Sequence, residues 1–155
     1  MQLIDIISKD LIQFDVDAST KKKALQLMGE LFVAHTPNLD SKEIYHALLE
    51  REKLGSTYVG YGIAIPHCRY SSISEPLACV MRLKNYIDFS GSNTQKVNII
   101  FGLILPEDNN ELHINMLSKI ASFIDDKKLR DTLHTVHNPE EIYEKISEYS
   151  KEHQF

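Results

Sequence analysis

The groups best suited to chemistry lie in one irregular stretch, residues 51–67, which reads REKLGSTYVGYGIAIPH and ends on a histidine. Near neutral pH a histidine is largely uncharged, so a ring nitrogen of His67 can act as a nucleophile. Phosphoryl transfer onto that nitrogen needs in-line placement and donors for three phosphoryl oxygens. Arg51, Ser56 and Thr57 could supply those donors. The alternative is a surface histidine that follows a loop of structural glycines.

The glycines of this stretch suit a turn that holds an anion. Gly55, Gly60 and Gly62 permit positive φ and close approach of another group, and neighbouring hydroxyls add donors beside exposed amides. The pattern is not a Walker loop, because no Lys-Ser/Thr pair follows the second glycine at the needed spacing. It is not a dinucleotide fingerprint either, because a third glycine is missing after Gly62 and residues 63–66 cannot begin a helix.

A rigid connection is expected directly before the histidine. Residues 63–65, IAI, predict a short buried strand that ends at Pro66. Proline fixes φ and removes a backbone donor, so it gives the strand a fixed end. We therefore expect the imidazole of His67 at a strand end, on the rim of the fold, where a scaffold can both position and expose it.

A second histidine is expected at the start of a helix. Asn109 or Asn110 can cap a helix over the following residues, and His113 falls near its amino end. The free amides and the dipole at that end favour a nearby anion. A phosphate on His67 would be stabilised there if the fold brings the two rings together. The alternative is a surface histidine in a first helical turn.

Metal and thiol chemistry are less favoured by the pattern. His46, His67, His113 and Cys68 lack the spacing of a metal-ligand set. Cys68 could be a reactive thiol, but a buried or rim residue is the preferred interpretation. With Cys79 as the only other cysteine there is no disulfide framework, so a reduced, cytoplasmic protein is expected.

The elements that must position these groups predict an α/β fold, with residues 1–155 as a single domain. Apolar patterning predicts a short strand at residues 11–16 and longer strands at residues 77–83 and 97–105. Helical spacing and caps predict five helices, around residues 20–36, 40–48, 110–124, 129–136 and 139–149. Helices before and after the strands imply a sheet covered on both sides.

Charge and hydropathy exclude some classes of partner. The net charge of −5 disfavours broad attraction to nucleic acid or to an anionic membrane. The one basic run, residues 21–23, is interpreted as a solvated first helical turn. The start MQLIDIISKD lacks the pattern of a signal peptide, and no apolar run approaches the ~20 residues that span a bilayer.

Two groups of residues together resemble a known family. The first, RExLGST followed by GxGIAIPH, resembles the active-site signature of type-2 enzyme IIA domains of the bacterial phosphoenolpyruvate-dependent phosphotransferase system, the fructose, mannitol and nitrogen-regulatory branch. The second is the family's later pattern, made of residues 103–106 (LILP), 112–114 (LHI) and Leu117. A closing NPEEIY at residues 138–143 resembles its last helix, so the resemblance covers nearly the whole chain.

The resemblance implies both fold and chemistry. It implies a single α/β domain with a mixed β-sheet between helical layers. It implies that His67 accepts a phosphoryl group from the phosphohistidine of an HPr-like carrier, with His113 and Arg51 lining the same pocket. It places Ser56 and Thr57 in the neighbouring loop. It also implies that no metal, nucleotide or other cofactor takes part in this step.

Two residues depart from the family pattern. Tyr58 stands where the family usually has glycine, and Cys68 stands where glycine commonly follows the histidine. A side chain at Tyr58 requires a backbone geometry that a Cβ atom tolerates, so the loop is expected to differ locally. Neither change removes a group that the transfer needs.

The residues of the signature, REKxGST and GxGIAIPH, favour the nitrogen-regulatory type, a phosphorylation-dependent regulator that docks on target proteins. Two alternatives stay open: a sugar-specific subunit that passes phosphate to an enzyme IIB, and a binding module that acts without phosphate. A neighbouring gene for a permease and IIB would favour the former. Partner control that survives a His67→Ala change would favour the latter.

Overall fold

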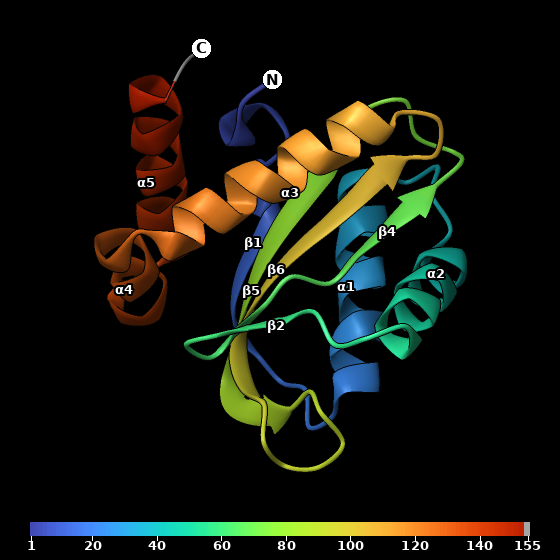
Figure 1. Ribbon diagram of the computed structural model, residues 1–155, viewed down its shortest axis with the longest axis horizontal. Coiled ribbons are helices and arrows are strands. Elements are labelled where there is room, and N and C mark those ends of the chain that lie inside the picture. The colour runs from blue at the N-terminus through green and yellow to red at the C-terminus, as the bar shows by residue number, and fades with distance from the viewer. Residues whose placement is uncertain (154–155) are drawn as a thin grey trace.

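A mixed β-sheet lies between two layers of helices in the computed structural model, which describes residues 1–153 (Figure 1). The strands are β1 (Ile12–Val16), β2 (Tyr58–Gly60), β3 (Ile63–Ala64), β4 (His67–Tyr70), β5 (Leu77–Asp88) and β6 (Lys96–Pro106). Two 3₁₀ turns, η1 (Leu3–Asp5) and η2 (Lys9–Leu11), precede them. The helices are α1 (Lys21–His35), α2 (Ser41–Lys53), α3 (Asn110–Asp125), α4 (Lys127–Thr135) and α5 (Pro139–Glu152).

The sheet is organised around its longest two strands. The strand order is β1-β5-β6-β3-β2, and β4 also pairs with β6 further along that strand. β5 and β6 form an antiparallel pair, while β1 runs parallel to β5, and β3 and β4 run parallel to β6. Residues 97–105 are nearly all buried, which fits the prediction of a central strand covered on both faces.

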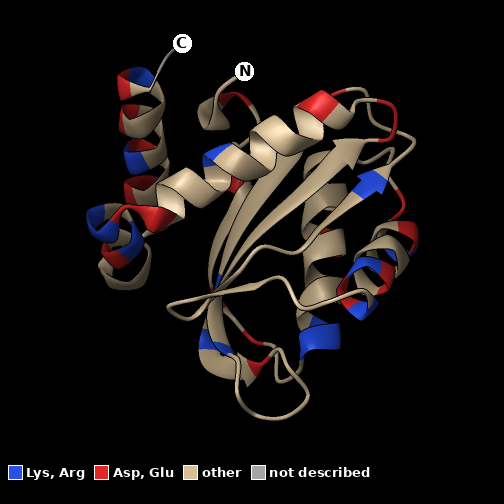
Figure 2. Ribbon diagram, in the orientation of Figure 1, with Lys and Arg blue, Asp and Glu red and all other residues tan. Residues whose placement is uncertain are grey.

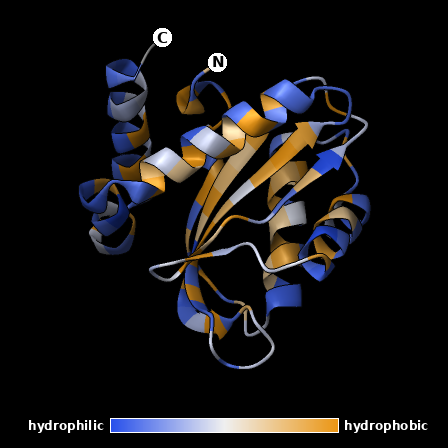
Figure 3. Ribbon diagram, in the orientation of Figure 1, coloured by the Kyte–Doolittle hydropathy of each residue, from blue (hydrophilic) through white to orange (hydrophobic). Residues whose placement is uncertain are grey.

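The two faces of the sheet are covered by different parts of the chain. α1 and α2 pack against each other and lie behind the sheet, against β5 and β4 (Figure 1). α3 crosses in front of the sheet against β6, and α5 packs beside β1. Apolar strands fill the middle of the fold, and the outer helix faces are hydrophilic (Figure 3). The buried rings of Phe32, Phe101 and Phe123 show that both layers share one core with the sheet.

The predicted helix starts are confirmed by side-chain caps. Thr20 accepts a hydrogen bond from the amide of the third residue of α1, and Asp40 accepts from two amides of α2. Asn109 and Asn138 do the same for α3 and α5. These polar side chains satisfy amides that have no partner within the helix, so each fixes a start locally.

The segment around the histidine differs from the prediction in its strands and in exposure, because His67 is buried, at 8% exposed, rather than exposed on a rim. The expected strand over residues 63–65 is shorter, Ile63–Ala64, and His67 does not follow a strand end. His67 instead begins a new strand, because the proline interrupts the pairing with β6 for only two residues. β5 is also longer than the predicted residues 77–83, since it continues to Asp88.

The glycine turn adopts the expected backbone. Gly60 and Gly62 have φ of 94° and 76°, and Tyr61 between them has φ of 58°. A non-glycine residue rarely adopts this region, so the β2–β3 turn is held by its surroundings. The Tyr61 carbonyl accepts from the His134 ring, at 2.8 Å, and the Tyr61 ring lies under the Arg130 guanidinium.

None of the helices within residues 1–153 combines the length and the apolar character needed to cross a bilayer.

Candidate active site

His67 is held so that one ring nitrogen is free. Its Nδ1 lies 2.9 Å from the carbonyl oxygen of Ile65. A carbonyl oxygen only accepts, so Nδ1 carries the proton and donates, which leaves the lone pair on Nε2. The backbone is fixed as well, because the Pro66 carbonyl accepts from the Leu103 amide of β6 at 3.0 Å. The imidazole therefore presents Nε2 in a set direction.

The surroundings keep this ring uncharged. His67 is 8% exposed, and burial is the main cause that lowers its pKa below the usual value of 6.5. The positive charge of Arg51 lowers the pKa further, while the bond to Ile65 and the carboxylate of Glu52 raise it. The net direction is downward, so the ring is neutral at pH 7 and Nε2 is nucleophilic.

The fold brings the second histidine beside the first. His113 lies in the first turn of α3, and its ring centroid is 5.6 Å from that of His67, at an interplanar angle of 80°. Its Nδ1 is buried without a hydrogen-bond partner. A buried N–H without an acceptor is rarer than an unused lone pair, so we assign the proton to Nε2, a free donor.

His113 is also kept neutral at rest. Its pKa is lowered first by burial and then by the charges of Arg69, His67 and Arg51. The charges of Arg69 and Arg51 would instead stabilise an anion placed between the rings, because the same field that disfavours imidazolium favours phosphate. A phosphoryl group arriving here would raise the pKa of His113, because a nearby anion favours the protonated, charged ring.

Arg51 is anchored by the loop that follows its helix. It belongs to the last turn of α2, and its Nη1 donates to the Gly55 carbonyl at 2.9 Å. A guanidinium has five N–H donors, so this bond orients the group and leaves others for an anion. The positive charge of Arg51 lowers the pKa of both histidines.

The two hydroxyls of the loop have different roles. Ser56 is exposed, and its oxygen accepts from the Tyr58 amide at 3.2 Å, so its O–H is free to donate. Thr57 is buried and gives its amide and its hydroxyl to the carboxylate of Glu52, at 3.1 and 2.5 Å. In this structure Thr57 therefore does not offer the phosphate donor expected from the sequence, and it holds the loop instead.

Three charged residues near the site were missed by the sequence reasoning. Glu52 is buried and pairs with Lys21 of α1, Nζ to Oε1, at 2.9 Å. The interpretation of residues 21–23 as a solvated turn is thus wrong for Lys21, because helix packing carries its side chain inward to a carboxylate. Arg69 follows His67 by two residues on β4, so strand alternation puts both on one face, a signal that was available.

The two departures from the family pattern leave the site intact. Cys68 is buried, and burial raises the pKa of its thiol to about 12, so the thiol stays protonated and unreactive. Both Cys68 and Cys79 are free thiols. Tyr58 opens β2 and pairs with Ala64 of β3, so the added side chain is accommodated in a strand.

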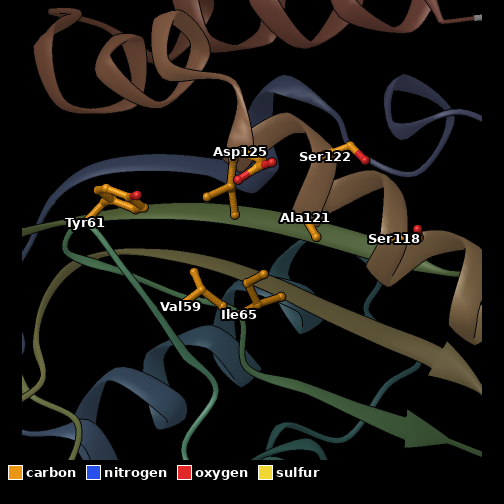
Figure 4. Close-up of a pocket in the computed structure, with 8 residues that line it drawn as sticks. Val59, Tyr61, Ile65, Ser118, Ala121, Ser122 and Asp125 are labelled. Carbon is orange, nitrogen blue, oxygen red and sulfur yellow. The ribbon is translucent and has the colours of Figure 1, made fainter.

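A nearby depression is separate from the histidine pair. It measures about 320 Å³ and lies between the β2–β3 turn and α3 (Figure 4). Val59, Tyr61, Ser118 and Asp125 are among the residues that line it, and they include no cation. Its chemistry therefore does not suit a phosphate.

The charges around the site are mixed rather than uniformly basic. α2 carries both signs, and β4 carries its one basic residue, Arg69, near its end (Figure 2). Within residues 1–153 no group of three or more His, Cys, Asp or Glu side chains is placed to hold a metal ion. Around His67 the structure places the Arg51 guanidinium, the His113 imidazole and the Ser56 hydroxyl as donors for an anion.

Comparisons of the sequence with known proteins find one family along most of the chain. The family profile "Phosphoenolpyruvate-dependent sugar phosphotransferase system, EIIA 2" matches residues 5–149. A nitrogen regulatory protein of Pseudomonas aeruginosa is 34% identical over 144 residues, 93% of this chain and 94% of that protein. The nitrogen regulatory protein of Escherichia coli K12 is 31% identical over 149 residues, 96% of this chain and 91% of that protein.

Solved structures show the same similarity in three dimensions. The crystal structure of nitrogen regulatory protein IIA-Ntr from Neisseria meningitidis superposes with a TM-score of 0.85 at 30% identity, covering 93% of this chain and 98% of that one. IIA mannitol from Escherichia coli superposes with a TM-score of 0.70 at 23% identity, over 90% of this chain and 97% of that one, and shares the fold.

Proposed function

The chain belongs to the EIIA 2 family of the phosphoenolpyruvate-dependent sugar phosphotransferase system, and from that premise we propose that His67 accepts a phosphoryl group from the phosphohistidine of an HPr-like carrier. The protein is a phosphocarrier with a regulatory role, as the similar nitrogen regulatory proteins indicate. The nitrogen-regulatory and sugar-specific branches share this fold and family, so the assignment of the phosphate to His67 rests on the geometry of the site.

One observation carries the assignment of the acceptor atom. Because Nδ1 of His67 donates to the Ile65 carbonyl, the lone pair that can attack phosphorus is on Nε2. In the step, a P–N bond forms to Nε2 while the P–N bond of the donor breaks, and the donor imidazole leaves with that electron pair. The Ile65 carbonyl then stabilises the N–H of the more positive His67 ring.

The charge of the transferring group is met by side chains from two elements. Arg51 contributes a guanidinium from α2 and His113 an N–H from α3, while the exposed hydroxyl of Ser56 can add a donor. Such preorganised donors are the main way in which proteins assist phosphoryl transfer, because the reaction needs positioning and charge stabilisation more than covalent help.

The surface around the histidines suits a protein donor. Leu54, beside the loop, is 85% exposed, and Ile114, beside His113, is 67% exposed. Exposed apolar side chains that flank a reactive group favour docking of another protein. A phosphate on His67 would add negative charge to the middle of this surface, so the free and modified forms would present different faces to regulated target proteins.

The test is transfer from a defined donor. The chain is mixed with phosphoenolpyruvate, enzyme I and an HPr-type carrier, and the modified residue is identified by mass spectrometry under alkaline conditions. We expect one phosphoryl group, on His67, and none on a folded His67→Ala variant. Full modification of that variant would place the acceptor elsewhere.

The same sample distinguishes the branches of the family. Adding an enzyme IIB to the modified chain tests the sugar-specific alternative, since rapid and complete transfer to IIB would favour a transport subunit. Retention of the phosphate, with binding partners that differ between the free and modified forms, supports the regulatory role.

A further inference from the structure

A network of hydrogen bonds lies behind the loop of residues 54–57, and it begins at a largely buried ion pair. Lys21, the first residue of α1, has a side chain only 21% exposed, and its Nζ lies 2.9 Å from Oε1 of Glu52 in α2. The same Nζ donates to the Phe89 carbonyl at 3.1 Å and lies over the Phe89 ring. A cation with three such partners is fixed in place, unlike a solvated lysine.

The carboxylate of Glu52 passes this constraint to the loop. Its Oε1 accepts the Thr57 amide and its Oε2 accepts the Thr57 hydroxyl. A buried carboxylate that accepts three hydrogen bonds holds its donors in a defined geometry. Thr57 is therefore fixed by two bonds from one side chain.

Thr57 in turn connects to the acceptor ring. The Ile65 amide donates to the Thr57 carbonyl at 3.0 Å, and the Ile65 carbonyl accepts from His67 Nδ1 at 2.9 Å. The chain of contacts from Lys21 to His67 is thus unbroken and crosses from α1 through α2 and the loop to β4.

A side branch of this network reaches the guanidinium. The loop between α2 and Thr57 also contains Gly55, whose amide donates to the Glu52 carbonyl at 3.1 Å and whose carbonyl accepts from Arg51. The position of this loop therefore orients Arg51 as well as His67. The carboxylate of Glu52 holds Thr57 at the end of this loop, and its backbone carbonyl holds Gly55, so both groups of Glu52 contribute to the position of the loop.

We propose that Lys21 and Glu52 are positioning residues for phosphoryl transfer, which act through Thr57 to orient the acceptor ring of His67 and the guanidinium of Arg51. This inference rests on the proposed function. Lys21 has a second effect, because its charge balances a carboxylate that would otherwise repel the incoming phosphoryl group. Neither residue contacts the reacting atoms.

Charge-neutral variants test the proposal against close controls. Glu52→Gln and Lys21→Met each remove one charge of the pair, while Glu50→Gln in the same helix and Lys22→Met in the same turn remove exposed charges. The donor is an HPr-type carrier phosphorylated with phosphoenolpyruvate and enzyme I. We expect the saturating transfer rate of the two test variants to fall roughly tenfold or more, with little change in the half-saturating donor concentration.

The pH profile separates positioning from simple loss of stability. Three charged or titratable groups act on or contact His67: Arg51 and Glu52 from α2 and His113 from α3. Arg69, two residues along the strand of His67, lowers the pKa of His113. Glu52 raises the pKa of His67, so Glu52→Gln should move the acid limb of the rate to lower pH. Lys21→Met keeps the carboxylate, so it should slow transfer without that shift.

A conservative pair keeps the test valid if a charge variant folds poorly. Thr57→Val removes the hydroxyl at nearly constant shape, and Thr57→Ser restores it. We expect the Val variant to transfer several-fold more slowly and the Ser variant to approach the parent. Circular dichroism and thermal melts on all variants identify any that are unfolded at the assay temperature.

The outcomes are distinguishable. If the parent chain is not modified on His67, the proposed function itself fails. If the parent is modified, and folded Glu52→Gln, Lys21→Met and Thr57→Val all transfer at the parental saturating rate, the positioning role is overturned. Slower transfer of these variants at an unchanged half-saturating concentration, with both controls at the parental rate, supports it.

Discussion

The two histidines of the site are held to different degrees. The ring of His67 is fixed by a bond from Nδ1 to a backbone carbonyl, and that carbonyl belongs to a hydrogen-bonded chain that reaches α1. The ring of His113 has a buried Nδ1 with no hydrogen-bond partner among the described residues. In the proposed transfer the acceptor must attack in line, so a fixed direction suits His67, whereas His113 would have only to follow the charge of the phosphate.

Among variants that keep the His67 ring, the largest effect should come from removing the less constrained ring of His113. His113→Ala takes away a donor to the transferring group but leaves the acceptor in place, so labelling should slow by about 10²-fold and not stop. The measurement is the single-turnover rate of phosphate appearance on His67. His137→Ala, which removes an exposed histidine, is the control and should label at the parental rate. Parental labelling of His113→Ala would remove His113 from the site.

The next effect is the dependence of the free energy of unfolding on pH. Burial lowers the pKa of both His67 and His113 below 6.5, so each ring binds protons less readily in the folded protein than in the unfolded one. The unfolded state therefore takes up more protons below pH 6.5, and the free energy of unfolding should fall as the pH decreases through that range. Transfer should persist below pH 6.5, because His67 is still neutral there.

Denaturant melts from pH 7.5 to 5 measure this linkage. A His67→Asn variant lacks one of the two titrating rings, so its stability should depend less on pH than that of the parent. A parent whose stability is flat or rises on acidification would contradict the neutral, buried state of the two rings.

A smaller effect is expected at the departure from the family pattern. Tyr58 lies in β2, and neither its ring nor its hydroxyl is part of the network that holds His67. Tyr58→Gly should therefore keep the transfer rate within about threefold of the parent, with some loss of stability from the more flexible backbone. The assay is labelling at saturating donor. Complete loss of labelling would show that the tyrosine has become essential.

The smallest effect on transfer should come from a cap far from the site. Asn138 accepts from the third amide of α5, so Asn138→Ala should lower the free energy of unfolding by about 1 kcal/mol. Labelling should match the parent at a temperature where both are folded. A slower rate in this variant would mean that the assay responds to stability in general, and the comparison of the two histidines would then need stability-matched variants.

The sequence predicted much of the scaffold because the signals are local. A cap at Asn138 followed by proline, or the apolar run in β6, depends on residues within one turn or one strand. The length of β5 and the interruption before His67 were predicted less well. Strand ends depend on which neighbour supplies hydrogen bonds, and that neighbour is distant in the sequence.

By itself the sequence determined the nature of the chemistry: a histidine behind a glycine turn, with a guanidinium and hydroxyls nearby, in a chain whose motifs resemble one family. The tertiary structure decided which groups meet. The register of β4 on β6 and the crossing of α3 put His113 beside His67, and the packing of α1 on α2 turned Lys21 inward to Glu52. Such contacts join residues far apart in the chain, and periodicity within one segment carries no information about them.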